Sequence, residues 1–263
     1  MIGAGLIGVV LLTAIVSFMW TPYNPTVVTS DRLLAPSGTH WLGTDALGRD
    51  VFSELLAGAR ITLYVGVIAV GLGALIGIPL GVVAAAAPRW VGQLVMRAID
   101  LMLAFPALLL AIIAAAALGA STLSAMIAIG VATAPPFARL ARSSALQVMG
   151  SEYVLAARVA GRPPLAIALR HVLPNISSVL IVQASVSYGI SVLAESGLSY
   201  LGFGTPPPTA SWGRMLQEAQ PVIFAQPLLS LWPAAAIALA VLGFNLLGDG
   251  LRDLFDPRLE DQR

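Results

Sequence analysis

Residues 61–87 read ITLYVGVIAVGLGALIGIPLGVVAAAA and contain no charged side chain. A bilayer is crossed by about 20 helical residues, so this stretch is long enough to span a membrane. Backbone polar groups in lipid must pair within their own segment, which makes a helix the expected conformation. Gly73, Gly77 and Gly81 recur at four-residue spacing and predict a flat face for close packing against another helix.

Five more apolar stretches accompany this one. The expected spans cover approximately residues 2–20, 61–87, 99–118, 123–148, 176–194 and 227–247. Of the 263 residues, 58% are hydrophobic and 10% are charged, whereas soluble domains carry about 25% charged residues. The sequence therefore predicts an all-α polytopic membrane protein with six transmembrane helices in a single domain over residues 1–263. The first stretch lacks a basic n-region and a small-residue cleavage site, so it is interpreted as a retained span.

The arginines predict which loops face the cytoplasm. With the N-terminus inside, ten arginines fall in cytoplasmic segments: Arg89, Arg97, Arg139, Arg142, Arg158, Arg162, Arg170, Arg252, Arg258 and Arg263. The four on the opposite side are Arg32, Arg49, Arg60 and Arg214. This excess predicts cytoplasmic termini, a cytoplasmic loop over residues 151–174, and external loops over residues 21–60 and 195–226.

Composition argues against several classes of function. The chain has no lysine, so it cannot carry a Walker A loop, and any ATP hydrolysis that drives it must occur on another chain. There is no cysteine, and His40 and His171 are far apart without acidic neighbours, so no metal site is predicted. A net charge of +1 without a basic stripe argues against nucleic acid as a partner. No catalytic set is apparent at membrane depth, so an intramembrane enzyme is not expected.

One expected span carries a polar stripe. Its members share a helical face: Gln183, Ser187, Tyr188, Ser191 and Glu195. Polar groups in lipid are costly, so the stripe is expected to face protein or water. It is either part of a translocation path or a set of hydrogen bonds between helices, with Glu195 near the external boundary. Elsewhere, Asp100 is expected to pair with Arg97, three residues earlier, rather than to act as a proton relay.

Residues 153–160 predict a short cytoplasmic helix. Ser151 is a suitable N-cap, and Glu152 in the first turn complements the helix dipole. Gly161 has the position and the flexibility of a residue that ends a helix. Two adjacent alanines in this helix leave a surface that another protein can approach closely.

A second short helix is expected over residues 165–173. The preceding Pro163-Pro164 pair turns the chain, and Arg170 and His171 fall in the last helical turn, where positive charge is favoured. Pro174 is expected to close this helix. The resulting exposed pair of helices is either an amphipathic interfacial element or a rigid device that transmits motion from a partner.

Small and apolar residues of this loop follow a known pattern: Ala156-Ala157-x-x-x-Gly161 and, twelve residues on, Leu173-Pro174. The pattern resembles the "EAA" loop of bacterial ABC import permeases, which docks into a cleft on the ATPase subunit. Leu155 stands where that loop usually has glutamate, and His171 stands where it usually has isoleucine.

Three further segments are similar to the dipeptide/oligopeptide/nickel group of these permeases. They are HWLGTDALGRD at 40–50, ESGLSYLG at 195–202 with PPP at 206–208 and SWG at 211–213, and NLLGDGLRD at 245–253 with DPR at 256–258. They occur in the expected order, and together they identify the chain as similar to the C-type partner of the two permeases in such importers.

The resemblance implies a type I importer permease fold and a set of partners. These are a homologous second permease, two ABC ATPase subunits that hold ATP and magnesium, and an external substrate-binding protein. No cofactor is expected in this chain itself. The resemblance also implies the residues of the ATPase-coupling loop: Glu152, Ala156, Ala157, Arg158, Gly161, Arg170, His171 and Pro174.

The implied activity is non-catalytic transport of dipeptides or oligopeptides by alternating access across the bacterial cytoplasmic (inner) membrane. Three alternatives stay open. They are an importer of nickel chelates or glutathione from the same family, a self-contained secondary transporter, and a purely structural membrane subunit.

Overall fold

The computed structural model describes residues 2–255, and its regular structure is helical apart from one isolated β-bridge. The long helices are α1 (Ile2–Met19), α2 (Val51–Ala86), α5 (Thr122–Met149), α8 (Leu173–Tyr200) and α10 (Leu228–Phe255). The shorter elements are α3 (Arg89–Ala104), α4 (Ala107–Leu118), α6 (Glu152–Val159), α7 (Pro164–Ile167), the π-helix η1 (Ala168–Val172), α9 (Trp212–Ala219) and the 3₁₀-helix η2 (Gln220–Val222). The predicted all-α fold is therefore confirmed for these residues.

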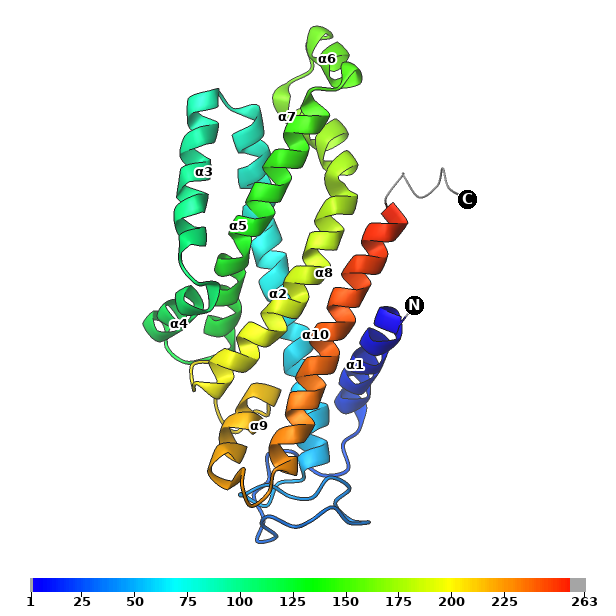
Figure 1. Cartoon of the computed structure of the whole chain (residues 1–263), viewed down its shortest axis with the longest axis vertical. Coiled ribbons are helices and arrows are strands. Elements are labelled where there is room, and N and C mark those ends of the chain that lie inside the picture. The colour runs from blue at the N-terminus through cyan, green and yellow to red at the C-terminus, as the bar shows by residue number, and fades with distance from the viewer. Residues whose placement is uncertain (1, 256–263) are drawn as a thin grey trace.

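The long helices run side by side between two dissimilar ends (Figure 1). α6 projects where α5 finishes, at what is here called the knob end, whereas the segment 20–50 and α9 lie at the opposite, α9 end. Within residues 2–255, five helices are long and apolar enough to cross a membrane, or six if α3 and α4 together form one span.

α2 and α5 pack closely because glycines remove the side chains between them. An added Cβ at Gly77 would lie 2.3 Å from the carbonyl oxygen of Ala134, and one at Gly81 would lie 2.3 Å from that of Ala138. One at Gly73 would lie 2.3 Å from Thr133 Oγ1 and 3.1 Å from the carbonyl oxygen of Gly130, both in α5. The three glycines thus bring the two backbones together along a single face of α2.

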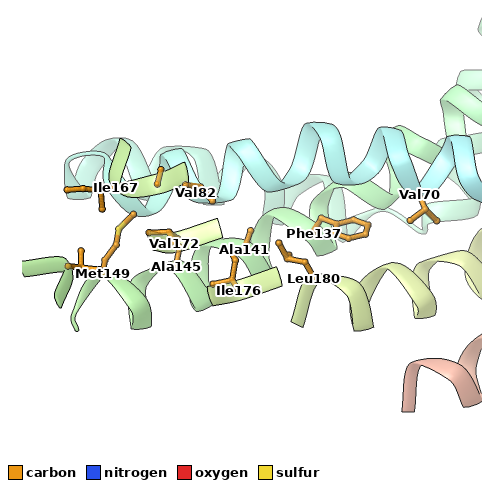
Figure 2. Packing of buried hydrophobic residues seen from close by; sticks show 12 residues of the cluster. Val70, Val82, Phe137, Ala141, Ala145, Met149, Ile167, Val172, Ile176 and Leu180 are labelled. Atoms are coloured by element: carbon orange, nitrogen blue, oxygen red, sulfur yellow. The ribbon is translucent and has the colours of Figure 1, made fainter. Parts of the chain in front are cut away.

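An apolar core joins the knob end to this helix pair (Figure 2). Its buried members include Val70, Val82, Phe137, Ala141, Ala145, Met149, Val154, Ile167, Val172, Ile176 and Leu180. Because Val154 belongs to α6 and Ile167 to α7, the base of the projecting segment is anchored in the same core as α2, α5 and α8.

α2 begins ten residues before the expected span 61–87, inside the expected external loop 21–60. Asp50 caps the helix, since its carboxylate accepts a hydrogen bond from the backbone N–H of Ser53 at 2.8 Å. The first turns of α2 are polar, and the apolar pattern alone therefore missed them.

The later helices also extend beyond the apolar stretches that predicted them. α8 passes the end of the expected span 176–194 and reaches Tyr200, and α9 lies within the expected loop 195–226. α10 continues past the expected span 227–247 to Phe255. Helical hydrogen bonding does not stop where the apolar composition ends. The polar residues that follow in α8, such as Glu195 and Ser199, are buried against neighbouring protein, whereas those of α10, such as Asp249 and Arg252, are exposed.

The prediction of one helix over residues 99–118 is wrong. The chain forms α3 and α4, which meet at an angle of 88°. Pro106 disfavours the helical conformation for the residue before it, and Phe105 accordingly has extended backbone angles of φ −89° and ψ 138°. α3 also begins earlier than expected, at Arg89, so Arg97 lies within a helix rather than in a loop.

Candidate functional site

The candidate site begins with a projecting segment, residues 151–172, here called the knob (Figure 1). Ser151 occupies the N-cap position of α6, as predicted, but its hydroxyl donates to the carbonyl of Val148 at 2.6 Å. It therefore does not accept a hydrogen bond from the first turn of α6. Glu152 lies in that turn and is exposed.

α6 ends at Val159 and is followed by a Schellman motif centred on Gly161. Gly161 has φ +74°, its N–H donates to the carbonyl of Arg158 at 2.9 Å, and the N–H of Arg162 donates to that of Ala157 at 3.1 Å. This pair of bonds needs a residue that tolerates positive φ, and glycine does so without strain. The turn that reverses the chain after α6 is thus fixed by backbone hydrogen bonds.

The second half of the knob is not the separate helix, closed by Pro174, that the sequence predicted. α7, η1 and α8 form one continuous helical segment. In η1 the N–H of Leu173 donates to the carbonyl of Ala168, five residues back, which is the π-helical pattern. The side chain of Asn175 donates to the carbonyl of His171 at 2.7 Å and so supplies a local donor beside the proline, which has none.

The outward surface of the knob is apolar with a charged rim. Its exposed apolar side chains are Tyr153, Leu155, Val159, Leu165 and Leu169, and its exposed charged ones are Glu152, Arg158, Arg162 and Arg170. Val159 is 91% exposed. Ala156 is exposed and Ala157 half-buried, so a partner can approach the α6 backbone closely. Clustered exposed apolar side chains with a polar rim are typical of a protein-binding surface.

The structure places the polar stripe mostly inside the chain. Ser187, Ser191 and Glu195 are 2%, 0% and 1% exposed. The Tyr188 hydroxyl donates to the carbonyl of Leu63 in α2 at 3.0 Å, and its ring stacks on Phe244 of α10. Tyr188 therefore connects α8 to α2 and α10, whereas the hydroxyl groups of Ser187 and Ser191 form their hydrogen bonds within α8.

Gln183 is the member of the stripe that reaches an open surface. Its amide donates to Ser187 Oγ at 3.0 Å, and its side chain helps to line a cavity of about 530 Å³ between α5, α8 and α10. A role for the stripe in translocation stays a prediction that rests on Gln183, the member that lines this cavity.

Glu195 joins three elements at the α9 end. Its Oε1 accepts hydrogen bonds from Ser199 Oγ at 2.6 Å and from Thr205 Oγ1 at 3.4 Å. Thr205 in turn lies 3.3 Å from Thr122 Oγ1 at the start of α5. The sequence placed Glu195 at a boundary, but nothing in its spacing indicated the two threonines.

A buried charge cluster at the α9 end was missed by sequence reasoning. The Arg49 side chain is 5% exposed and pairs with Asp45 at 2.5 Å, with Glu54 at 3.0 Å and with Glu218 of α9. Burial alone would lower the pKa of Arg49, but the attraction of Glu54, Asp45 and Glu218 outweighs it and raises that pKa above its usual value. The guanidinium therefore stays charged and holds α9 to the start of α2.

The carboxylates of this cluster lie close enough together to resemble a cation site. Asp45, Glu54 and Glu218 have oxygens within 4.8 Å of one another. Arg49 pairs with all three, so its guanidinium supplies the positive charge that a metal ion would otherwise provide. His40, expected to lack acidic neighbours, lies with Nδ1 2.9 Å from Asp50 Oδ1.

Asp100 does not pair with Arg97 as expected. Its Oδ1 accepts a hydrogen bond from Arg139 Nη2 of α5 at 2.5 Å. The side chains of Asp100 and Arg139 are 56% and 58% exposed, so this ion pair lies on an open surface of the helix bundle.

The sequence is similar to a family of transport proteins and to several of its individual members. The family described as "Binding-protein-dependent transport system inner membrane component" matches residues 77–261. A dipeptide transport system permease protein, DppC, of Alkalihalophilus pseudofirmus is 42% identical over 88% of this chain and 76% of its own length. A glutathione transport system permease protein, GsiD, of Pectobacterium atrosepticum is 42% identical over 88% and 77%, and a putative peptide permease protein of Brucella suis is 38% identical over 98% and 88%.

The fold is also found among solved structures. A chain of the MetNI methionine ABC transporter, in an inward-facing conformation, superposes with a TM-score of 0.63. The match covers 77% of this chain and 97% of that one at 18% identity, and it shows the expected type I importer permease fold.

Proposed function

The chain belongs to the family of binding-protein-dependent transport system inner membrane components, and from this premise we propose that it is the permease subunit of an ATP-driven peptide importer. With a homologous second permease it forms the path by which peptides cross the bacterial cytoplasmic membrane. It is multi-pass, with both termini on the cytoplasmic side. It hydrolyses nothing itself: ATP and magnesium bind to two ATPase subunits, and an external binding protein delivers the substrate.

The observation that carries this proposal is the construction of the knob. Its exposed apolar surface offers a protein partner a docking site, with Val159 the most exposed of its apolar side chains. Because the chain continues from α7 through η1 into α8 without a break, a displacement of the docked knob is passed directly to a membrane-spanning helix. An ATPase that binds the knob with different affinity in its ATP-bound and ATP-free states can therefore shift the path between its two openings.

Movement of α8 would reach the rest of the bundle through its packing. Tyr188 of α8 contacts both α2 and α10, and Ile176 and Leu180 lie in the core shared with α5. Alternating access then follows from a rocking of these packed helices around the substrate, with the knob as the point at which force is applied.

The test is ATP-driven uptake of a labelled dipeptide by the complete importer in liposomes. We expect Val159→Asp to lower uptake at least about tenfold, because a carboxylate buried unpaired at an apolar interface costs more than about 1.4 kcal/mol. Val159→Leu keeps the apolar surface and should leave uptake within about twofold of the unmodified chain.

Two results would contradict the proposal. Full uptake by the Val159→Asp importer would remove the knob from the coupling of ATP to transport. Uptake by this chain alone, driven only by an ion gradient, would make it a self-contained secondary transporter.

Glutathione is the second candidate substrate, because relatives named as glutathione permeases are as similar to this chain as the dipeptide permease is. Competition separates the two. Excess unlabelled glutathione should leave dipeptide uptake unchanged in a peptide importer, whereas it should suppress that uptake if glutathione is the substrate.

A further inference from the structure

Arg60 lies on α2 where that helix packs against the end of α1. Its Nε donates a hydrogen bond to Ser17 Oγ at 2.7 Å, and its guanidinium carbon lies 4.8 Å from the centre of the Phe18 ring. Ser17 is 1% exposed, and its hydroxyl in turn donates to the carbonyl of Ala14 at 2.7 Å. A hydrogen bond on one edge and an aromatic ring on one face thus hold the guanidinium in a fixed orientation.

The other edge of this guanidinium is available to a ligand. Arg60 is half-buried, and its Nη1 and Nη2 have neither a hydrogen-bond acceptor nor an ion-pair partner among residues 2–255. Arg49, Arg139 and Arg214, by contrast, each pair with a carboxylate of this chain. Two parallel N–H donors on one planar edge match two oxygens of a carboxylate or a phosphate. The oriented guanidinium of Arg60 is therefore suited to bind an anion.

Two markers in the chain place Arg60 at the edge of the apolar region. The uncharged stretch 61–87 begins at the next residue of α2. Ser17 lies two residues before the end of α1, a helix long enough and apolar enough to span a membrane. Both helices thus change from apolar to polar sequence close to the contact between Ser17 and Arg60. The phosphate groups of lipids lie at such an edge, just outside the hydrocarbon core.

Aromatic side chains flank this guanidinium on α1, on α2 and on the segment that joins them. Trp20, Trp41 and Phe52 form one cluster, in which the Trp41 ring centre is 6.5 Å from that of Trp20 and 5.0 Å from that of Phe52. Tyr64 packs edge-on against Phe18 and is 45% exposed. Tryptophan and tyrosine gather where a membrane meets water, because their rings fit among the lipid head groups. This surface therefore has the composition of a membrane interface.

The surface on the far side of Phe18 is suited to acyl chains. α1 lies at the edge of the bundle, where it packs against α2 and α10 (Figure 1). Its outward side chains and those of the adjacent part of α2 are apolar: Val9, Leu12, Ile15, Val67 and Ile68 are all exposed. Neither α1 nor the stretch 61–87 contains a charged residue, so nothing on these two stretches neutralises Arg60.

We propose that Arg60 binds the phosphate group of an anionic phospholipid in the leaflet at the α9 end, with the acyl chains along α1 and α2. Nη1 and Nη2 donate to two phosphate oxygens, and Ser17 holds the guanidinium in place. A lipid of net charge −1, such as phosphatidylglycerol, is preferred to phosphatidylcholine, whose choline group brings a positive charge beside Arg60. This inference needs only that the chain spans a membrane, so it is independent of the transported substrate.

Native mass spectrometry of the complete importer in detergent measures the bound lipid directly. Phosphatidylglycerol and phosphatidylcholine with the same acyl chains are titrated in parallel, and the unmodified importer should bind phosphatidylglycerol more tightly. Arg60→Gln should weaken the tightest phosphatidylglycerol binding step at least about tenfold, because it removes hydrogen bonds to a charged group. Arg32→Gln removes the same charge from an exposed position in the segment 20–50, and it should change that step by less than about twofold.

Two further variants separate an oriented site from simple attraction of charge. Arg60→Lys keeps the charge but cannot donate two parallel hydrogen bonds, so it should bind phosphatidylglycerol more weakly than the unmodified importer. Ser17→Ala keeps the arginine but removes the hydroxyl that orients it, and it should reduce the preference for phosphatidylglycerol over phosphatidylcholine. If neither variant changes the binding of phosphatidylglycerol, there is no oriented site and the inference is overturned.

Three other results would also overturn the inference. The first is equal binding of the two lipids to the unmodified importer, a measurement that needs no variant to fold. The second is displacement of the lipid by excess inorganic phosphate, which would make a free anion the ligand. The third is release of the second permease by Arg60→Gln without any loss of lipid, which would pair the guanidinium with a carboxylate of that subunit. ATP-driven dipeptide uptake tests the proposed function separately.

Discussion

At the α9 end, Arg49 lies buried among Asp45, Glu54 and Glu218, and Glu195 accepts hydrogen bonds from Ser199 of its own helix and from Thr205 of the following loop. At the knob end, α6 is held by little more than the buried side chain of Val154 and leaves most of its apolar residues in the open. One end thus satisfies its polar and charged groups within the chain. The other keeps a surface that a partner can cover, as the proposed coupling to an ATPase requires.

Arg49→Gln should produce the largest loss of stability, because it removes the central charge of the buried cluster at the α9 end. Without the guanidinium, three carboxylates remain close together in a buried site. Removal of one partner from a buried ion cluster costs about 3–5 kcal/mol, so we expect a loss of this size in the free energy of unfolding. Thermal unfolding of the detergent-purified chain measures it.

Arg32→Gln is the control, since Arg32 lies in the same irregular segment but is exposed. It should change the free energy of unfolding by less than about 0.5 kcal/mol. Equal effects of the two substitutions would show that the cluster does not lock this end.

Gly77→Leu should have the next largest effect, because it separates the helix pair that connects the two ends. A side chain at Gly77 has no room, as the added Cβ alone would meet the Ala134 carbonyl oxygen at 2.3 Å. Overpacking of this kind costs about 1–3 kcal/mol, and we expect a loss of that size in thermal unfolding.

Gly71→Leu is the matched control for this contact. Gly71 lies on the same helix, and an added Cβ there has nothing within 4 Å. A destabilisation by Gly71→Leu as large as that by Gly77→Leu would mean that glycine content in α2, and not the contact with α5, sets its stability.

The sequence predicted what depends on composition and local spacing. The apolar stretches gave the long helices, the four-residue glycine spacing indicated the packed face of α2, and Gly161 marked the end of α6. Each of these features is decided by neighbours a few residues away, so it can be derived from a single sequence.

Features that depend on distant residues escaped prediction. Arg49 forms an ion pair with Glu218, which is far away in the sequence. Asp100 pairs with Arg139 of α5 and not with Arg97, which is nearer in the sequence. The extent of α2 and the passage of the helix through Pro174 likewise depend on capping and π-helical bonds whose geometry has no simple sequence pattern. Arg258, Arg263 and the DPR segment at 256–258 lie outside the described residues. The expected cytoplasmic position of the two arginines therefore stays a prediction.

The smallest effect on stability is expected at the knob end, from Gly161→Val. Gly161 has φ +74° and open space around it, so a substitution is resisted by backbone conformation and not by packing. An L-residue with this conformation costs roughly 1–2 kcal/mol, less for asparagine, so Gly161→Asn is the matched control. Because α6 can loosen without disturbing α2 and α5, thermal unfolding should fall by about 1 kcal/mol or less, while amide exchange in α6 accelerates. Dipeptide uptake by the complete importer should fall with Gly161→Val and be largely retained with Gly161→Asn. If Gly161→Val loosens α6 but uptake is unchanged, an ordered knob is not needed for transport. The difference between the self-contained α9 end and the exposed knob end would then have no role in coupling.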